Sequence, residues 1–444
     1  MSVPAGYLSA SEQPLSSIHD VLLLDLDGTT YLGAVAAPNA PQALAEAKKA
    51  GARTMYLTNN SGRSPQVVAD HLSSIGIATA PSEVLNSSQV AARTAEKLLP
   101  SGAKVLLIGG EGLRAAFAQT SFCIVTCADD KPQAVVQGLS ESVGWAELSE
   151  AALAISKHGA MHIATNLDAT LPRERGEMIG NGSLVACISN ATGTTPINCG
   201  KPEPAMFSIG SEIAQARKPL AVGDRLNTDI AGAVAAGIPC FHVLTGVCDA
   251  RAIMTAEPSW RPSYLGIDLL DLNSPQPAVT RKENESPLAS AQYSTGSWLC
   301  GAWSARVADG YISICRNECA PAHSQTAERI SSEMTISSLT SSAAEHTTHI
   351  FSEIMIPLDS AHKQYGENVQ EGVRDEKISL PLDAYRAAVC AMWEAADRTI
   401  IDPSGLQLPE IEIVRAEAFM CDVPDADSAD SAVDADNADG NCYE

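Results

Sequence analysis

The chain has 444 residues, and this length predicts two or three domains. Its 53 acidic and 29 basic residues give a formal net charge of -24 at pH 7. Nucleic acids and anionic membranes are polyanions, so this charge argues against both as partners, although a local cation can still favour an anionic small molecule in one pocket. With no signal-like start and no apolar run of about 18 residues, we expect a cytoplasmic protein.

Short apolar runs alternate with helical segments from about residue 18 to 270. This alternation predicts an α/β fold with a doubly wound, Rossmann-like parallel sheet, in which ligands bind at the carboxyl ends of the strands. The runs are VLLLDL (21–26), RTMYLT (53–58), KVLLIG (104–109), QAVVQGL (133–139), MHIAT (161–165), PLAVGD (219–224) and IPCFHVL (238–244).

The sequence changes character after about residue 271. Residues 273–290 are rich in Pro, Ser and charge and are interpreted as a linker. The segment 297–316 predicts a β-hairpin with its turn at Asp309 and Gly310. The segment 382–400 predicts an amphipathic helix.

The stripe of that helix, Tyr385, Val389 and Trp393, is expected to face the core. We therefore expect a small α+β C-terminal domain over 291–420, with a mobile Ser/Thr-rich stretch inside it. The last segment, 421–444, is acidic and lacks basic residues, so it is predicted to be a disordered tail.

The first strand ends in two aspartates, Asp25 and Asp27, separated by one residue. Side chains alternate along a strand, so both carboxylates point to the same side, where they repel each other unless a cation, a reaction or solvent compensates. The second strand ends in TNNSG, Thr58–Gly62, and a hydroxyl with backbone N–H groups at such a turn suits an oxyanion. Asn and Gly are also common turn residues, so this signal is weak alone.

Two further segments carry charge. Lys201 lies between Gly and Pro ahead of a helical segment, where an isolated lysine is normally just solvated. Asp224 and Asp229 follow another apolar strand, where they could also be a helix cap and a first-turn acid. We expect four strand ends of one parallel sheet to bring the two aspartate pairs, the Thr58 hydroxyl and Lys201 to the same edge. There the carboxylates select a hard cation such as Mg²⁺, and the lysine and hydroxyl indicate a phosphate ligand.

Four motifs occur in order: DLDGT at 25–29, TNNS at 58–61, GKPEP at 200–204 and GDRLNTD at 223–229. This order resembles the haloacid dehalogenase (HAD) superfamily, in particular its NagD-like phosphatases of subfamily IIA. The resemblance implies a HAD core over 18–86 and 191–272 with an inserted α/β cap domain over 87–190. It also implies that the chain is a phosphoric monoester hydrolase.

The resemblance implies a role for each matching residue. Asp25 is expected to be the nucleophile that forms an aspartyl-phosphate, and Asp27 to protonate the leaving alcohol and later activate water. The other expected roles are Mg²⁺ binding by Asp25, the backbone carbonyl of Asp27 and Asp224; phosphoryl binding by Thr58 and the amides around Asn59 and Asn60; charge compensation by Lys201; and orientation of the metal shell or of Lys201 by Asp229.

The expected partner is a small-molecule phosphate ester, because a large cap that closes over a site favours metabolites over phosphoproteins. In relatives the loop 165–172 faces the substrate, so Asn166, Asp168 and Leu171 are expected to bind it. ATNLDATLP and AYRAAVCAMW resemble segments of actinobacterial glycerol-3-phosphate phosphatases, which implies glycerol 3-phosphate as substrate. Phosphoglycolate, pyridoxal phosphate, a sugar phosphate or a nucleotide are the alternatives.

Three other functions are alternatives for this sequence. Carbon–halogen hydrolysis needs no leaving-group acid, and a receiver domain needs no cap, so Asp27 and the long insertion before Lys201 disfavour them. A catalytically silent HAD-fold binding or regulatory protein is the third, and the full set of expected catalytic side chains disfavours it. The resemblance leaves a homo-oligomer open.

Overall fold

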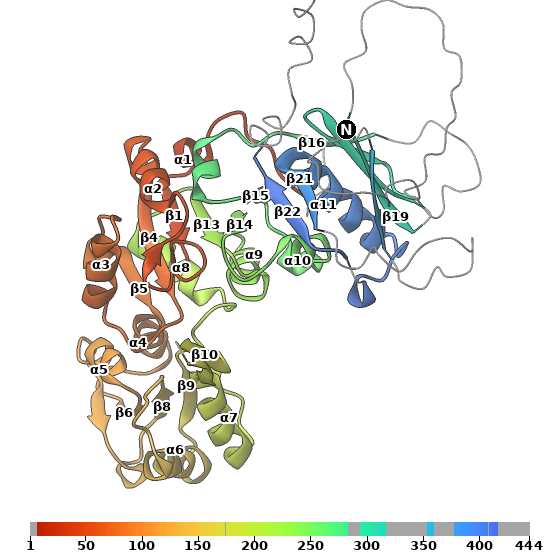
Figure 1. Cartoon of the computed structure of the whole chain (residues 1–444). Helices are drawn as coiled ribbons and strands as arrows, with labels where there is room; N and C mark the ends of the chain where they lie inside the picture. Colours follow the sequence, from red (N-terminus) through yellow and green to blue (C-terminus); the bar gives the residue numbers. More distant parts are fainter. Residues whose placement is uncertain are drawn as a thin grey trace, which may run out of the picture.

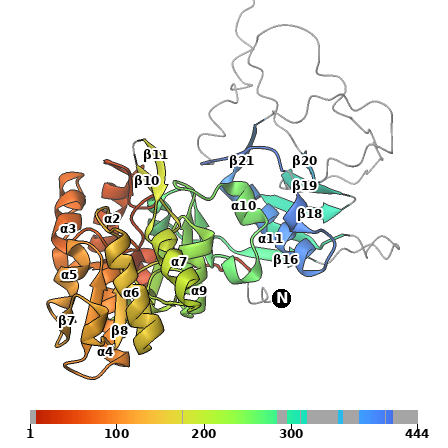
Figure 2. The ribbon, with the colours of Figure 1, turned by 90° about the horizontal axis from the view of Figure 1, so that it is seen from below.

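The computed structural model describes residues 7–173, 175–282, 294–308, 310–316, 353–358, 377–406 and 408–415. They form a central parallel sheet, a second parallel sheet inserted within its sequence, and an antiparallel sheet near the C-terminus. In Figure 1 the central sheet lies between the other two parts. In Figure 2, seen from below, the inserted part overlaps the central part and the C-terminal sheet lies to one side. The expected α/β fold with an inserted α/β part and a small C-terminal part is confirmed.

The central sheet has the strand order β15-β14-β13-β1-β4-β5, and all neighbouring strands are parallel. Along the chain, strands are added from β1 to β4 and β5 on one side of the sheet, and from β13 to β14 and β15 on the other side. The direction of strand order therefore reverses between the neighbours β1 and β13. Ligands of such sheets bind at this reversal point. The strands are β1 Val21–Leu24, β4 Arg53–Thr58, β5 Val84–Asn86, β13 Pro219–Gly223, β14 Cys240–Val243 and β15 Tyr264–Gly266.

All four residues of β1 are buried, because helices cover both faces of the sheet. Leu22 and Leu24 pack in one apolar cluster with residues of α2 and α3, whereas Leu23 packs on the other face with Phe207 of α8. The helices around this sheet are α1 Leu15–Ile18, α2 Ala40–Lys49, α3 Pro65–Ser74, α4 Ser87–Leu98, α8 Ala205–Ile213, α9 Ala231–Ala235 and α10 Ala250–Met254. A short hairpin, β2 Tyr31–Leu32 and β3 Val35–Ala36, follows β1.

The inserted sheet, called the cap here, has the order β12-β9-β8-β6-β7 and is also parallel. One predicted boundary is wrong: β12, Ile197–Asn198, lies in the range expected for the core but pairs with β9 of the cap. Two residues are too short a strand to show a pattern in the sequence. The other cap elements are β6 Lys104–Ile108, β7 Cys123–Val125, β8 Ala134–Gln137, β9 Met161–Ala164, the hairpin β10 Thr170–Arg173 and β11 Gly176–Ile179, and helices α5 Glu111–Phe117, α6 Trp145–His158 and α7 Asn181–Thr192.

The C-terminal sheet is antiparallel, in the order β16-β17-β18-β19-β20. The expected hairpin over 297–316 is confirmed by the pairing of β18 with β19, although Asp309 of its turn lies outside the described residues. The linker interpretation is wrong for Val279–Lys282, which form the edge strand β16; four residues next to Pro-rich sequence gave too short a pattern. The strands are β16 Val279–Lys282, β17 Ser297–Cys300, β18 Trp303–Ala308, β19 Tyr311–Arg316, β20 Glu353–Pro357, and a separate parallel pair β21 Ile378–Pro381 and β22 Ile411–Val414.

The helix predicted over 382–400 is α11, Leu382–Asp397. Its residues from 384 to 395 are all buried, so the helix is covered on every side rather than on one face only. The Tyr385 hydroxyl donates to the carbonyl of Ala250 (2.7 Å), and the Trp393 indole N–H donates to the carbonyl of Ile253 (2.8 Å). These bonds join α11 to α10, so the C-terminal sheet and the central sheet share one packed core.

Among the described residues, every helix is too short or too polar to span a lipid bilayer. The Ser/Thr-rich stretch and the acidic tail predicted over 421–444 lie outside the described residues.

Candidate active site

The end of β1 brings Asp25 to the order reversal of the central sheet. The Asp25 N–H donates to the carbonyl of Val222 in β13 (2.9 Å), and the Thr30 hydroxyl donates to the Asp25 carbonyl (2.6 Å). Gly28 then turns the chain with φ of 90°, and a Cβ atom at this position would lie 2.4 Å from Oδ2 of Asp224. A glycine is required here because the backbone conformation and the close approach both exclude a side chain.

The side chain of Lys201 reaches Asp25 from the cap side of the site. It follows β12 of the cap, so the prediction that its motif ends a strand of the central sheet is wrong. Its side chain is only 3% exposed, and Nζ donates to Oδ1 of Asp229 (2.7 Å) and to Oδ1 of Asp25. Burial alone would lower the pKa of Lys201, but the two carboxylates outweigh burial and raise it, so the ammonium stays charged.

The end of β13 supplies two more carboxylates. Asp224 accepts hydrogen bonds from the Thr29 hydroxyl (3.1 Å) and the Val247 N–H (2.7 Å). Asp229 lies in a single π-helical turn, Leu226–Ile230, that follows β13. One oxygen atom from each of Asp25, Asp224 and Asp229 lies within 4.8 Å of the others.

The electrostatics of this carboxylate cluster favour a cation. Burial, with the charge of Asp229, raises the pKa of Asp224 to about 6. Burial and the charge of Asp229 also raise the pKa of Asp25, against the opposing charge of Lys201. Three carboxylates against one ammonium leave negative charge uncompensated, and a divalent cation with a preference for oxygen ligands fits that charge.

The loop after β4 holds the expected phosphate-binding residues together. The Thr58 hydroxyl accepts from the N–H of Asn60 (3.1 Å), and the Asn60 side-chain oxygen accepts from the N–H of Gly62 (2.9 Å), so this loop is a tight turn. Asn59 joins the loop to the lysine motif, because its Oδ1 accepts from the Lys201 N–H (2.8 Å) and its Nδ2 donates to the Lys201 carbonyl (3.2 Å).

The predicted substrate residues of the cap lie against the same loop. Asn166 Nδ2 donates to the Asn59 carbonyl (2.7 Å), and the Asp168 carboxylate accepts from Asn59 Nδ2 (3.2 Å). Leu171 is in β10, opposite Met178 of β11, and has no comparable contact with the loop among the bonds of the described residues. The structure therefore brings Asn166 and Asp168 against Asn59, which also binds the Lys201 backbone, while Leu171 lies on the β10–β11 hairpin.

Several residues of the site were not assigned from the sequence. Thr29 holds Asp224, and Thr245 holds the turn by donating to the Gly28 carbonyl (2.6 Å). The Ser61 hydroxyl accepts from the Leu139 N–H of the cap (3.1 Å). Thr29 and Ser61 lie inside the quoted motifs, which could have drawn attention to them, whereas Thr245 lies in an ordinary loop sequence.

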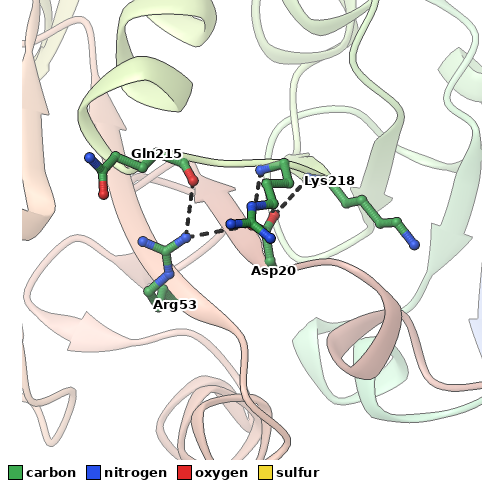
Figure 3. A pocket seen from close by; sticks show the side chains of 5 residues that line it. Asp20, Arg53, Gln215 and Lys218 are labelled. Carbon is green, nitrogen blue, oxygen red and sulfur yellow. Dashed lines mark hydrogen bonds and ion pairs between the residues drawn. The ribbon is translucent and has the colours of Figure 1, made fainter.

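A separate cavity lies at the opposite edge of the central sheet, where β1, β4 and β13 begin (Figure 3). Arg53 lies 3.5 Å from the Asp20 carboxylate and donates to the Gln215 carbonyl (3.4 Å). Asp20 accepts from the N–H groups of Arg217 (2.9 Å) and Lys218 (2.7 Å). The lining groups thus bind one another and hold the strand starts in place, at the opposite ends of the strands from the carboxylate cluster.

Comparison with known proteins agrees with this geometry. Residues 22–123 match the family model of haloacid dehalogenase-like hydrolases, and residues 198–272 match a second model of HAD-like hydrolases. The chain is 41% identical over 299 residues to the D-glycerol 3-phosphate phosphatase of Mycobacterium tuberculosis, an alignment that covers 67% of this chain and 79% of the relative. It is 36% identical over 251 residues to an acid sugar phosphatase of Staphylococcus haemolyticus, covering 56% of this chain and 92% of that one.

Solved structures extend the similarity to the C-terminal part. The glycerol phosphate phosphatase of Mycobacterium tuberculosis, in complex with calcium, superposes with a TM-score of 0.65 at 33% identity and covers 91% of this chain and 96% of that one. The same enzyme in complex with magnesium gives a TM-score of 0.64. A p-nitrophenyl phosphatase of Archaeoglobus fulgidus matches 57% of this chain and 98% of its own length, with 26% identity and a TM-score of 0.53.

The chain belongs to the haloacid dehalogenase-like hydrolases. Within that family it is a phosphoric monoester hydrolase.

Proposed function

We propose that the chain hydrolyses glycerol 3-phosphate, with Mg²⁺ as cofactor and through an aspartyl-phosphate on Asp25. The observation that carries the proposal is the buried group formed by Lys201 and the carboxylates of Asp25, Asp224 and Asp229 at the order reversal of the sheet. The choice of substrate is supported by the similarity of this chain to the glycerol phosphate phosphatase of Mycobacterium tuberculosis, which extends over both the HAD part and the C-terminal part.

The metal would be held by Asp25, Asp224 and the backbone carbonyl of Asp27, with Asp229 beside them. When bound, Mg²⁺ supplies positive charge that stabilises the negative charge developing on the phosphoryl oxygens. Lys201 already contacts the expected nucleophile, so it can compensate charge on Asp25 and on the phosphate together. The backbone N–H groups around Asn59 and the Thr58 hydroxyl bind the remaining phosphoryl oxygens.

The reaction proceeds in two steps. In the first, a carboxylate oxygen of Asp25 forms a bond to phosphorus while the bond from phosphorus to the alcohol oxygen breaks, and Asp27 gives that oxygen its proton. In the second, Asp27 takes a proton from a water molecule whose oxygen attacks phosphorus, which releases phosphate and restores the Asp25 carboxylate. Although Asp27 keeps contact with solvent, desolvation by the surrounding protein raises its pKa, and this shift favours the protonated form that the first step needs.

The test is phosphate release from a panel that holds glycerol 3-phosphate, phosphoglycolate, pyridoxal phosphate, a sugar phosphate and a nucleotide. It compares wild type, Asp25→Asn and the control Asp70→Asn, whose carboxylate lies on α3 and accepts only from Gln66 among the described residues (2.7 Å). Each protein is assayed with Mg²⁺ and with chelator.

We expect Mg²⁺-dependent turnover that prefers glycerol 3-phosphate, survives Asp70→Asn and vanishes in Asp25→Asn. Preference for another ester would overturn the substrate and keep the chemistry. Full turnover by Asp25→Asn would overturn the nucleophile, and no release from any ester would favour a binding role.

A further inference from the structure

Tyr31 is a buried tyrosine directly behind the expected general acid. It begins the β2–β3 hairpin and is only 6% exposed. Its hydroxyl donates to Oδ2 of Asp27 over 3.2 Å. A buried tyrosine hydroxyl needs a partner, and here the partner is the carboxyl that the mechanism uses.

The backbone fixes Tyr31 in this position independently of Asp27. The N–H of Tyr31 donates to the Leu26 carbonyl (3.0 Å), and the Tyr31 carbonyl accepts from the N–H of Gly28 (2.8 Å). These bonds close a tight loop that returns the Tyr31 side chain to Asp27. The phenol ring therefore has its place set by the turn that leaves β1.

Packing holds the ring as well. The edge of the Tyr31 ring meets the ring of His71 in α3, with centroids 5.1 Å apart and planes at 83°. Tyr31 also belongs to the apolar cluster that fills the α2–α3 face of the sheet. A tyrosine side chain has few rotatable bonds, so a ring fixed at its base and its edge presents its hydroxyl at a defined point.

The carboxyl of Asp27 has no second hydrogen bond among the described residues to orient it, although the charges of Arg63 and Arg225 also act on it. Asp27 is an exposed residue, and its Oδ1 forms no hydrogen bond with another residue in the described part of the chain. With Oδ2 bound to Tyr31, Oδ1 remains for the substrate. A carboxyl that must meet a leaving oxygen within hydrogen-bond distance gains from such orientation.

We propose that Tyr31 is a positioning residue that holds the Asp27 carboxyl in the orientation needed to protonate the leaving alcohol. The inference rests on the proposed function, because it requires Asp27 to be the general acid. Tyr31 touches neither the substrate nor the carboxylate cluster in this proposal and acts only through Asp27. Its effect must therefore depend on how much the leaving group needs a proton.

The experiment measures release of the alcohol in single turnovers of the Mg²⁺-loaded enzyme with two esters. Glycerol is a poor leaving group and needs the proton, whereas 4-nitrophenol leaves readily without it. For Tyr31→Phe we expect release of glycerol to slow by about 10- to 100-fold, the range for losing a hydrogen bond to a group that becomes charged, as Asp27 does when it gives up its proton. Release of 4-nitrophenol should slow by less than about threefold. The control Tyr264→Phe, which changes a half-buried tyrosine at the start of β15, should leave both rates unchanged.

Two further variants separate the explanations. In an Asp27→Asn background, Tyr31→Phe should cause no additional loss, because its route to the substrate is gone. Asp27→Glu keeps the acid and moves it past the Tyr31 hydroxyl, so it should slow glycerol release more than 4-nitrophenol release. This variant changes an exposed side chain, so it gives an answer even if Tyr31→Phe does not fold.

The outcomes distinguish the two proposals. If Asp27→Asn slows both esters equally, Asp27 is not the general acid, and the proposed mechanism and the role of Tyr31 both fall. If Asp27→Asn discriminates between the esters but Tyr31→Phe or Asp27→Glu does not, only the role of Tyr31 is overturned. Equal slowing of both esters by Tyr31→Phe would indicate a packing role alone.

Discussion

Replacement of Lys201 by methionine tests the electrostatic arrangement of the site most directly. The side chain is 3% exposed, and its ammonium contacts both Asp25 and Asp229. Methionine keeps most of the length and apolar volume but removes the charge. Removing one partner of a buried ion pair typically costs about 3–5 kcal/mol of unfolding free energy, because the charge left behind is uncompensated.

The size of the loss should depend on pH and on metal. In the variant the carboxylates lose the compensating ammonium, so the pKa values of Asp25 and Asp224, which are already raised in the wild type, should rise further. A carboxyl whose pKa is raised by folding binds protons in the folded state, so stability increases as pH falls through that pKa. We therefore expect the deficit of Lys201→Met to be smaller at pH 5 than at pH 8, and Mg²⁺ to restore part of it at pH 8.

The assay is urea unfolding at both pH values, with and without Mg²⁺, together with phosphate release. Lys104→Met is the matched control: that ammonium binds a carbonyl at the surface of the cap (3.0 Å), and its loss should change stability by less than about 0.5 kcal/mol. Equal stability of Lys201→Met and wild type at pH 8 would refute the view that this lysine compensates buried carboxylates.

Three further predictions concern other parts of the molecule. Gly28→Ala should raise the Mg²⁺ concentration needed for half-maximal activity, because its Cβ would lie 2.4 Å from Oδ2 of Asp224. Gly33 is the control, because it also has a positive φ but has open space around it. An equal effect of Gly28→Ala and Gly33→Ala would contradict the steric argument. Asn59→Ala should lower kcat as well as raise KM, since it releases both the lysine motif and the cap loop; a change in KM alone, in steady-state assays, would limit it to substrate binding. Burial lowers the pKa of His162 from 6.5 to about 4, so between these pH values the unfolded chain binds a proton that the folded chain does not. The free energy of unfolding should therefore fall by about 3 kcal/mol as pH drops from 6.5 to 4. In urea unfolding, His162→Gln should reduce this pH dependence, and an unchanged pH dependence would contradict the prediction.

The sequence predicted those site residues whose position follows from strand geometry. Asp25, Thr58 and Asp224 end or directly follow buried strands, and the alternation of strands and helices requires these ends to share one edge. Lys201 was predicted at the site but on the wrong element, because spacing along the chain does not reveal that a two-residue cap strand precedes it.

Other features depend on tertiary structure that a sequence pattern does not record. The apolar stripe of α11 was visible as Tyr385, Val389 and Trp393, but the helix is buried all round because the C-terminal sheet covers it from one side and α10 from another. The contact of Tyr31 with Asp27 depends on a turn that reverses the chain within four residues. The alternation of side chains along β1 ends before this turn, so it does not predict the contact.

The pairing of β1 with β13 has a consequence for synthesis of the chain. Val21 of β1 lies beside Pro219 of β13, and the whole cap is encoded between them. About 200 residues must therefore leave the ribosome after β1 before its second neighbour exists, which takes about 10–40 s at typical translation rates of about 5–20 residues per second. During that interval one edge of β1 is unpaired, so a chaperone that binds exposed strands would bind the segment that carries Asp25. The residues of the candidate active site come together only after the cap has been made, so a nascent chain arrested before β13 should have no phosphatase activity.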